Sequence, residues 1–309
     1  MLTYTIGTRG SRLSLAQTRW VADRLQRACP GLNLEIKTIL TSGDRDSRPL
    51  FTIDQKGIFE KEIDAAVARG EVDLAVHSLK DVPSTLSDGL VLACVPARAD
   101  PTDILITQNG LSLELLPSGY VIGTSSLRRA VQIRRSRPDI SVKPIRGNVE
   151  TRLAKIDGAL YHGVVLARAG VARLGLGVAS AELPGFLPSP GQGSLGVICR
   201  RDDRELISLL QMIEDANSRL EAEAERFLSD RLGSGCRFPL GALARVENGT
   251  MTLRAAAFSV DGKRSATSSI SGDRLNAERL AERVADDLLG QGAEDLASGW
   301  REGLEAWNR

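Results

Sequence analysis

The sequence predicts an α/β protein that ends in a small α+β domain. Strand-like and helix-like apolar patterns alternate over the first two thirds of the chain, as in βαβ units with a parallel sheet. Apart from Asp73, the run 72–76 is apolar and bounded by charges, which is typical of a strand buried on both faces. The last third groups its strands before a helix, as α+β domains do. A chain of 309 residues can hold two or three such cores.

The predicted elements follow from these patterns in chain order. We expect strands at 3–8, 34–40, 72–76, 104–107, 121–123, 142–145, 164–166 and 195–199. We expect helices at 11–28, 58–68, 126–135 and 149–156. The last third should contain a helical stretch at 204–230, strands at 242–247, 250–259 and 265–271, and a closing helix at 274–289. The polar segment 42–57 is long for a connection, and we interpret it as a lid or a binding loop.

Composition excludes several classes of protein. The formal net charge is +1, whereas a generic nucleic-acid binder needs a basic surface. No apolar run is long enough to span a bilayer. The amino terminus begins at once with a strand-like pattern and shows no signal peptide. We therefore expect a cytoplasmic protein that binds neither nucleic acid nor membrane.

The basic residues are strongly biased towards arginine. Only seven of the 40 basic residues are lysines. Arginine presents a planar fork that binds a carboxylate or phosphate with two hydrogen bonds. A GC-rich genome explains the same bias, so the positions of the arginines must decide between the two interpretations.

The cysteines and histidines do not have the spacing of a metal site. The four cysteines form no C-x-x-C pair, and the chain has only two histidines, so we expect no metal. Cys236 differs from the other cysteines because it lies in a Gly/Ser-rich turn beside Arg237. Exposure and a neighbouring cation favour a reactive thiolate, although an incidental loop thiol would show the same pattern.

Polar residues follow two of the predicted strands in the first half of the chain. Arg9 and Ser11 come after the first strand, where a helix begins, and Lys80 and Asp81 come after the buried strand. Ligands of open α/β sheets bind at the carboxyl ends of strands, and helix amino termini favour anions. Asp81 is a candidate acid/base, and Arg9 a candidate anion ligand. A solvated arginine and a helix-capping aspartate in a salt bridge are the alternatives.

A second set of strand ends carries hydroxyls and arginines. Thr124 and Ser126 precede a helix whose first turn contains Arg128 and Arg129. Cations at that end oppose the helix dipole, so we expect an anion to compensate for them. The pattern of strand, arginine, glycine and cap recurs at 144–149 and, less sharply, at 166–173. Together these strand ends predict a cleft for a ligand with many negative charges.

These segments resemble the porphobilinogen deaminase family. The matching pieces occur in the family's order and spacing: TRGSRLSLAQ, KGIFEKEID, VDLAVHSLKDVP, GTSSLRR, RGNVETRL, LARAGVARLGL, PGQGSLGVICR and GSGCRFPLG. The resemblance implies two doubly wound lobes, like those of type II periplasmic binding proteins, and a small α+β domain. Domain one would comprise 1–96 and 194–214, domain two 97–193, and domain three 215–309.

The resemblance also implies a chemistry. Members hold a dipyrromethane cofactor by a thioether to a cysteine, here Cys236. They add four porphobilinogen molecules to it with loss of ammonia and release hydroxymethylbilane by hydrolysis. Asp81 would be the catalytic carboxylate, and Lys56 and Phe59 would belong to an active-site loop. Cofactor and substrate would be bound by Arg9, Ser11, Lys80, Thr124, Ser125, Ser126, Arg128, Arg129, Arg146, Gly147, Asn148, Arg152, Ala167, Arg173 and Gln192.

Two other functions remain open from the residues alone. A solute-binding or effector-sensing protein of the same fold would use the arginines but would need neither Cys236 nor Asp81. A nucleic-acid-binding protein would use the arginines between 128 and 137, which the near-zero net charge disfavours. We expect a monomer, since no large apolar surface is evident.

Overall fold

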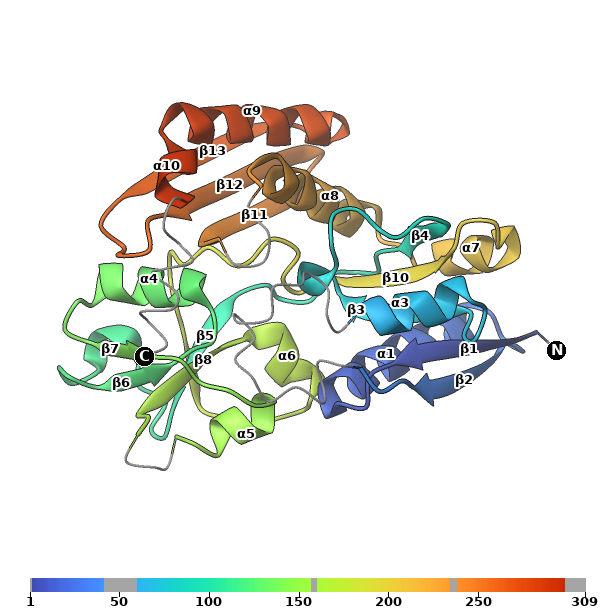
Figure 1. Cartoon of the computed structure of the whole chain (residues 1–309), viewed down its shortest axis with the longest axis horizontal. Coiled ribbons are helices and arrows are strands. Elements are labelled where there is room, and N and C mark those ends of the chain that lie inside the picture. Colours follow the sequence, from blue (N-terminus) through green and yellow to red (C-terminus); the bar gives the residue numbers. More distant parts are fainter. Residues whose placement is uncertain (1, 42–59, 157–159, 234–237, 298–309) are drawn as a thin grey trace. The chain divides into compact units, whose positions relative to one another are not determined.

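The computed structural model describes residues 2–41, 60–156, 160–233 and 238–297 (Figure 1). The chain divides into two compact units, each of which is discontinuous in sequence. Unit 1 comprises Met1–Ala99 and Gly193–Ala222, and unit 2 comprises Asp100–Gln192 and Glu223–Arg309.

Unit 1 contains a five-stranded sheet in the order β2-β1-β3-β10-β4. Its strands are β1 (Thr3–Thr8), β2 (Asn33–Thr38), β3 (Leu74–Ser78), β4 (Leu90–Cys94) and β10 (Leu195–Arg200). Strand β1 runs parallel to β2 and β3, whereas β10 lies antiparallel between β3 and β4. Its helical elements are α1 (Arg12–Ala28), α3 (Lys61–Ala68), the short 3-10 helix η2 (Leu79–Asp81) and α7 (Arg204–Gln211).

Helices cover both faces of this sheet. Leu74 and Val76 point to the face covered by α1 and α7, where Leu25 and Leu206 are fully buried. Ala75, between them in the strand, points to the opposite face, which α3 covers. This alternation buries both faces of β3, which explains why Leu74, Ala75 and Val76 are all apolar.

Unit 2 contains a second five-stranded sheet, in the order β7-β6-β8-β5-β9. Its strands are β5 (Asp103–Thr107), β6 (Val121–Gly123), β7 (Ser141–Lys143), β8 (Gly163–Ala167) and β9 (Ser180–Glu182). Strand β6 runs parallel to β7 and β8, and β5 lies antiparallel between β8 and β9. Helices α4 (Leu127–Ser136), α5 (Val149–Leu153) and α6 (Arg168–Arg173) follow β6, β7 and β8. Val165 packs in the cluster that contains α4, and its neighbours Val164 and Leu166 pack in the cluster on the α5 and α6 side.

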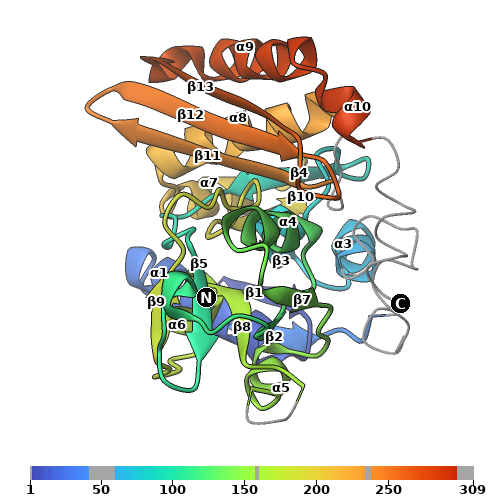
Figure 2. The same ribbon diagram turned by 90° about the vertical axis from the view of Figure 1, so that its left-hand side faces the viewer.

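The carboxyl-terminal part of unit 2 is an antiparallel meander with helices. Strands β11 (Leu240–Glu247), β12 (Thr250–Phe258) and β13 (Ser265–Asp273) pair in that order, and α9 (Ala277–Gly290) packs on β12 and β13 (Figures 1 and 2). The short helix α10 (Ala293–Ala297) follows α9, and α8 (Ala216–Arg231) precedes the meander. Leu253 in β12 and Val284 and Leu288 in α9 are fully buried, and each such side chain contributes roughly 1.5–3 kcal/mol.

The predicted fold class is confirmed: the chain has two sheets with helices on both faces, followed in sequence by a small α+β part. Some details were wrong, and strands β4 and β9 were not predicted. Each large sheet is mixed, because the apolar pattern of a buried strand is the same in either direction. The helical stretch 204–230 is two helices, α7 and α8, and Asp215 caps the second by accepting a hydrogen bond from the Ser218 amide at 2.8 Å.

Candidate active site

The carboxyl ends of β1 and β3 lie at one edge of the unit 1 sheet. Arg9 follows β1, and Lys80 and Asp81 form part of η2 directly after β3. The Asp81 side chain is exposed there, and Arg9 is half-buried. Ser11 caps α1, because its hydroxyl accepts a hydrogen bond from the Ser14 amide at 3.2 Å. The predicted grouping of these four residues at one sheet edge is therefore present.

Sequence reasoning missed a buried acidic residue beside Asp81. Glu60 immediately precedes α3, and only 7% of its surface is exposed. Burial and the nearby Asp81 carboxylate raise the pKa of Glu60 to about 8, against the opposing effects of its own backbone amide and of Arg9. In the sequence, Glu60 resembles an ordinary acidic residue at a helix start.

The unit 2 sheet presents a second edge, at the carboxyl ends of β6, β7 and β8. Ser126 caps α4, and its own amide donates to the Thr124 hydroxyl at 3.1 Å. The Ser125 hydroxyl donates to the carbonyl of Ile145, which joins the loops after β6 and β7. Asn148 caps α5 by accepting from the Thr151 amide at 2.8 Å. The predicted cap residues thus shape the loops of this edge.

Gly147 is required by the backbone of the same edge. Its φ is +115°, and an added Cβ would lie 2.5 Å from the methyl carbon of Thr151. Only glycine tolerates both the dihedral angle and the close approach. Ala167, at the end of β8, is the non-helical residue that precedes α6.

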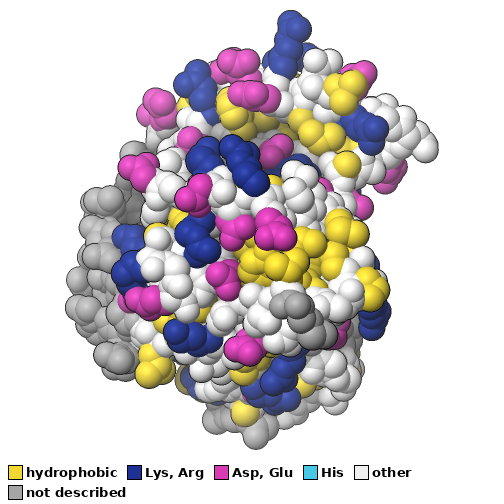
Figure 3. All heavy atoms as spheres, turned by 90° about the vertical axis from the view of Figure 1, so that its right-hand side faces the viewer, with side chains coloured by type: hydrophobic (Ala, Val, Ile, Leu, Met, Phe, Trp, Pro, Cys, Tyr) yellow, Lys and Arg dark blue, Asp and Glu magenta, His cyan; other side chains and the backbone are white. Residues whose placement is uncertain are grey.

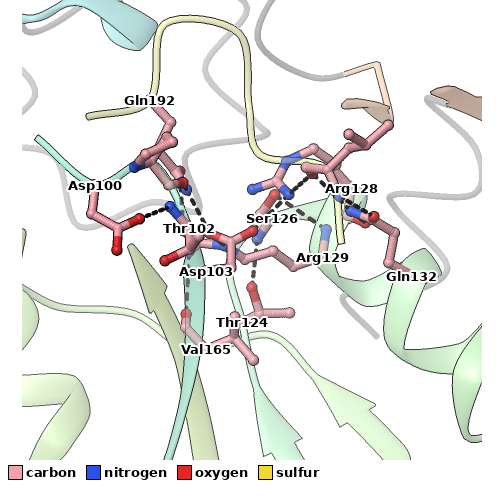
Figure 4. Close-up of polar contacts among 12 residues, drawn as sticks. Asp100, Thr102, Asp103, Thr124, Ser126, Arg128, Arg129, Gln132, Val165 and Gln192 are labelled. Carbon is pink, nitrogen blue, oxygen red and sulfur yellow. Dashed lines mark hydrogen bonds and ion pairs between the residues drawn. The ribbon is translucent and has the colours of Figure 1, made fainter. Parts of the chain in front are cut away.

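Arg128 and Arg129 share an internal carboxylate (Figure 4). Asp103, at the start of β5, accepts from Arg128 Nη1 at 2.7 Å, and from Arg129 Nε at 3.0 Å and Nη2 at 2.7 Å. All three side chains are buried. Burial alone would raise the pKa of Asp103, but the two arginines hold it well below its ordinary value.

Part of the negative charge expected at the start of α4 therefore comes from a carboxylate of the chain itself. Asp103 compensates for the two cations that oppose the helix dipole. Nothing in the local sequence pairs an aspartate with arginines 25 residues away. That Arg128 and Arg129 also bind a ligand stays a prediction.

Gln192 joins the same network. Its amide nitrogen donates to Asp103 Oδ1 at 2.7 Å and to the Pro101 carbonyl at 2.6 Å, and its carbonyl oxygen accepts from Arg129 (Figure 4). The neighbouring Gly191 amide donates to the fully buried Glu225 carboxylate at 2.6 Å. The other oxygen of Glu225 accepts from the Ala244 amide at 2.8 Å. The segment before Gln192 is thus attached on one side to the α/β sheet and on the other to β11.

Positive charge accumulates on the remaining arginines of unit 2. Burial, together with the nearby charges of Arg129 and Arg146, lowers the pKa of Arg152 to about 10. Burial alone lowers the pKa of Arg173 to about 10. Burial and both neighbouring arginines disfavour the charged form of Arg152. An anion bound here would stabilise that charged form.

Three predicted site residues, Lys56, Phe59 and Cys236, lie outside the described residues. Cys94 and Cys199 are buried, and burial raises the pKa of both thiols. Within 2–41, 60–156, 160–233 and 238–297, no three acidic, histidine or cysteine side chains gather as metal ligands would. No helix of those ranges has the length and apolarity to cross a membrane.

Comparison with known proteins identifies the family of the chain. The family model described as the dipyromethane cofactor binding domain of porphobilinogen deaminase matches residues 4–208, and that of the carboxyl-terminal domain matches 219–290. A probable porphobilinogen deaminase of Nitrosopumilus maritimus is 56% identical over 308 residues, 99% of each chain. A porphobilinogen deaminase of a Roseiflexus species is 46% identical and covers 96% of this chain and 99% of its own. This chain belongs to the porphobilinogen deaminase family.

Members of the family are transferases of tetrapyrrole biosynthesis, and porphobilinogen is the substrate of this chain. It polymerises four porphobilinogen molecules with loss of ammonia and releases hydroxymethylbilane, which confirms the predicted activity. Among solved structures, the methionine-binding protein MetQ is similar, with a TM-score of 0.43, 14% identity, and 70% of this chain and 92% of that chain covered.

The unit 2 edge fits the cofactor that the family holds. Dipyrromethane carries an acetate and a propionate on each ring. Arg152 lies beside two further cations, Arg129 and Arg146, and nothing among the causes of its pKa shift favours its charge. A group of carboxylates is the complement of such a cluster.

Proposed function

We propose that the sheet edge of unit 2 binds the carboxylates of the ligand and that the sheet edge of unit 1 supplies the acid/base group. The arginines of unit 2 bind the carboxylates of the cofactor and the growing chain. Asp81 of unit 1 carries the acid/base role. The clustering of Arg129, Arg146 and Arg152 is the observation that carries the proposal, because a ligand with several carboxylates is the one that this charge favours most.

The exposure of Asp81 supports this role. Its exposed carboxylate can accept a hydrogen bond from a pyrrole N–H. As the C–N bond of the aminomethyl group breaks and ammonia leaves, positive charge develops on the substrate, and an adjacent carboxylate stabilises it. When the new C–C bond forms, the attacked ring carbon loses a proton, which Asp81 can accept.

The residues at each sheet edge would have separate binding roles. Arg9, Ser11 and Lys80 lie at the Asp81 edge and would bind substrate carboxylates. The second edge is shaped by Thr124, Ser125, Ser126, Asn148 and Ala167. The cofactor would supply the pyrrole ring to which the first substrate is joined. Ligand carboxylates at this second edge would be bound by Arg128, Arg129, Arg146, Arg152 and Arg173, with Gly147 and Gln192 holding the backbone in place.

The thioether to Cys236 is tested by the intact mass of the purified protein, with peptide mapping around that cysteine. We expect an excess mass of one dipyrromethane on the peptide that contains Cys236. If the mass is unmodified, and porphobilinogen restores neither the adduct nor activity, the proposal fails and a solute-binding function becomes the better account.

Replacing Arg146 with leucine is expected to block cofactor assembly or the first additions. The variant removes one cation from the Arg129–Arg146–Arg152 cluster, and a hydrogen bond to a charged group contributes roughly 1.5–3 kcal/mol. Native mass spectrometry of the protein after addition of substrate counts the attached rings. Arg279→Leu, an exposed position on α9, is the matched control. Normal intermediates at normal rates in Arg146→Leu would refute the role.

We further propose a cytoplasmic monomer with three domains, at 1–96 with 194–214, at 97–193 and at 215–309. The family boundary between 208 and 219 supports the third domain. Sedimentation velocity tests the monomer.

We also propose that nucleic acid is not a partner. On the face shown in Figure 3, basic and acidic side chains are interspersed, in keeping with the net charge of +1. Such a surface gives little of the counterion release on which nucleic-acid affinity depends. A salt titration against a generic duplex should therefore detect no binding.

A further inference from the structure

The topology of unit 1 brings a second carboxyl group to the Asp81 edge. Strands β1 and β3 are parallel, so Arg9 and Asp81 follow them at the same edge. Helix α3 leads into β3 and runs back along the sheet, so Glu60 at its start lies at that edge as well. Three charged groups from three elements therefore meet there.

The two carboxyl groups differ in their exposure to water. Asp81 is exposed, whereas Glu60 is buried. Two carboxylates at close range do not both ionise readily, and burial penalises the charged form. The exposed group therefore keeps the negative charge, and the buried group keeps the proton. The raised pKa of Glu60, with Asp81 among its main causes, agrees with this order.

The other groups near Glu60 do not change which of the two carboxyl groups holds the proton. Asp64, one helical turn further along α3, is another nearby acid, and its carboxylate lies 2.9 Å from His77 Nε2 on β3. Arg9 is the cation that favours the ionised form. Strand β4 carries no charged residue, and Arg200 of β10 contacts the other end of α3 through the Val67 carbonyl.

We propose that Glu60 and Asp81 form a pair that holds one proton at neutral pH, with the proton on Glu60 and the charge on Asp81. Glu60 acts through Asp81 and is a positioning residue. The inference rests on the proposed role of Asp81. It assigns the alkaline limit of activity to the loss of the Glu60 proton.

A second negative charge beside Asp81 would weaken substrate binding. Porphobilinogen carries two carboxylates, so ionised Glu60 would repel it. KM should rise by roughly threefold to tenfold as the pH passes through the ionisation of Glu60, with a smaller change in kcat. Glu60→Gln, which mimics the protonated acid, should be active at pH 7 and should lack this rise.

The protonation state is measured without activity by infrared spectroscopy of the carboxylic-acid carbonyl stretch of the holoenzyme during a pH titration. The wild type should show a band that disappears near pH 8 and is absent from Glu60→Gln. Glu35→Gln, an exposed position on β2, is the matched control and should retain the band. Asp81→Asn should move the band's disappearance to lower pH, because the neighbouring charge is gone.

The outcomes separate this inference from the proposed function. If Asp81→Asn loses turnover but the band survives in Glu60→Gln, the proton-sharing pair is refuted and the role of Asp81 stands. If Asp81→Asn turns over normally, the role of Asp81 falls, and with it the assignment of the alkaline limit, whatever the infrared spectra show. A Glu60→Gln protein that does not fold would also overturn the pair, since glutamine replaces a neutral acid of the same shape.

Discussion

Replacing Asp81 with alanine is expected to lower turnover by about 10²–10⁴-fold and to leave the fold intact. The side chain is exposed at the end of η2, so its removal creates no buried cavity. The loss should fall on kcat and kcat/KM together, because the carboxylate is needed where charge develops. Steady-state consumption of porphobilinogen measures the effect.

A control separates the role of Asp81 from a general effect of charge. Asp88→Ala removes an exposed acid from the same unit, seven residues further along the chain, and should turn over like the wild type. Circular dichroism and intact mass should be unchanged in both variants. Turnover by Asp81→Ala within about threefold of wild type would remove this carboxylate from the mechanism.

Replacing Asp103 with asparagine is expected to destabilise unit 2 by about 3–5 kcal/mol. The substitution removes the negative charge that both Arg128 and Arg129 bind and leaves two cations buried. Urea unfolding followed by circular dichroism measures the loss. Asp139→Asn breaks an ion pair with Arg137 at an exposed position and should have little effect. A loss no larger than that of the control would show that the buried network does not stabilise the fold.

The same network sets an acid limit to stability. The pKa of Asp103 is lower in the folded than in the unfolded chain, so its contribution is complete above the ordinary carboxyl pKa, near 3.8. The contribution is lost as the pH falls below that value. Glu60 has the opposite sign, because its folded pKa is raised: its contribution favours folding at low pH and declines as the pH rises from about 4.5 towards 8.

The sequence allowed the elements and the two sheet edges to be predicted, because both depend on local patterns. Strand β1 has the predicted bounds, and α1 begins directly after the predicted cap Ser11. Cap residues such as Asn148 act within three or four positions, so their role is visible in a single sequence.

The features that could not be predicted depend on contacts between distant parts of the chain. The apolar pattern of β10 shows that it is buried but not that it runs antiparallel. Asp103 is bound by arginines 25 residues further on, and Glu225 by amides 34 and 19 residues away. Glu60 was missed because its burial depends on how α3 packs on the sheet.

The position of β10 has a consequence for synthesis on the ribosome. This strand lies between β3 and β4, yet it is translated roughly a hundred residues after them. The amino-terminal segment emerges first but must wait for residues 195–200 before its sheet can close, while β5 to β9 are contiguous in the chain. The second lobe can therefore fold before the first, and the nascent amino-terminal strands are the part that most needs protection from aggregation.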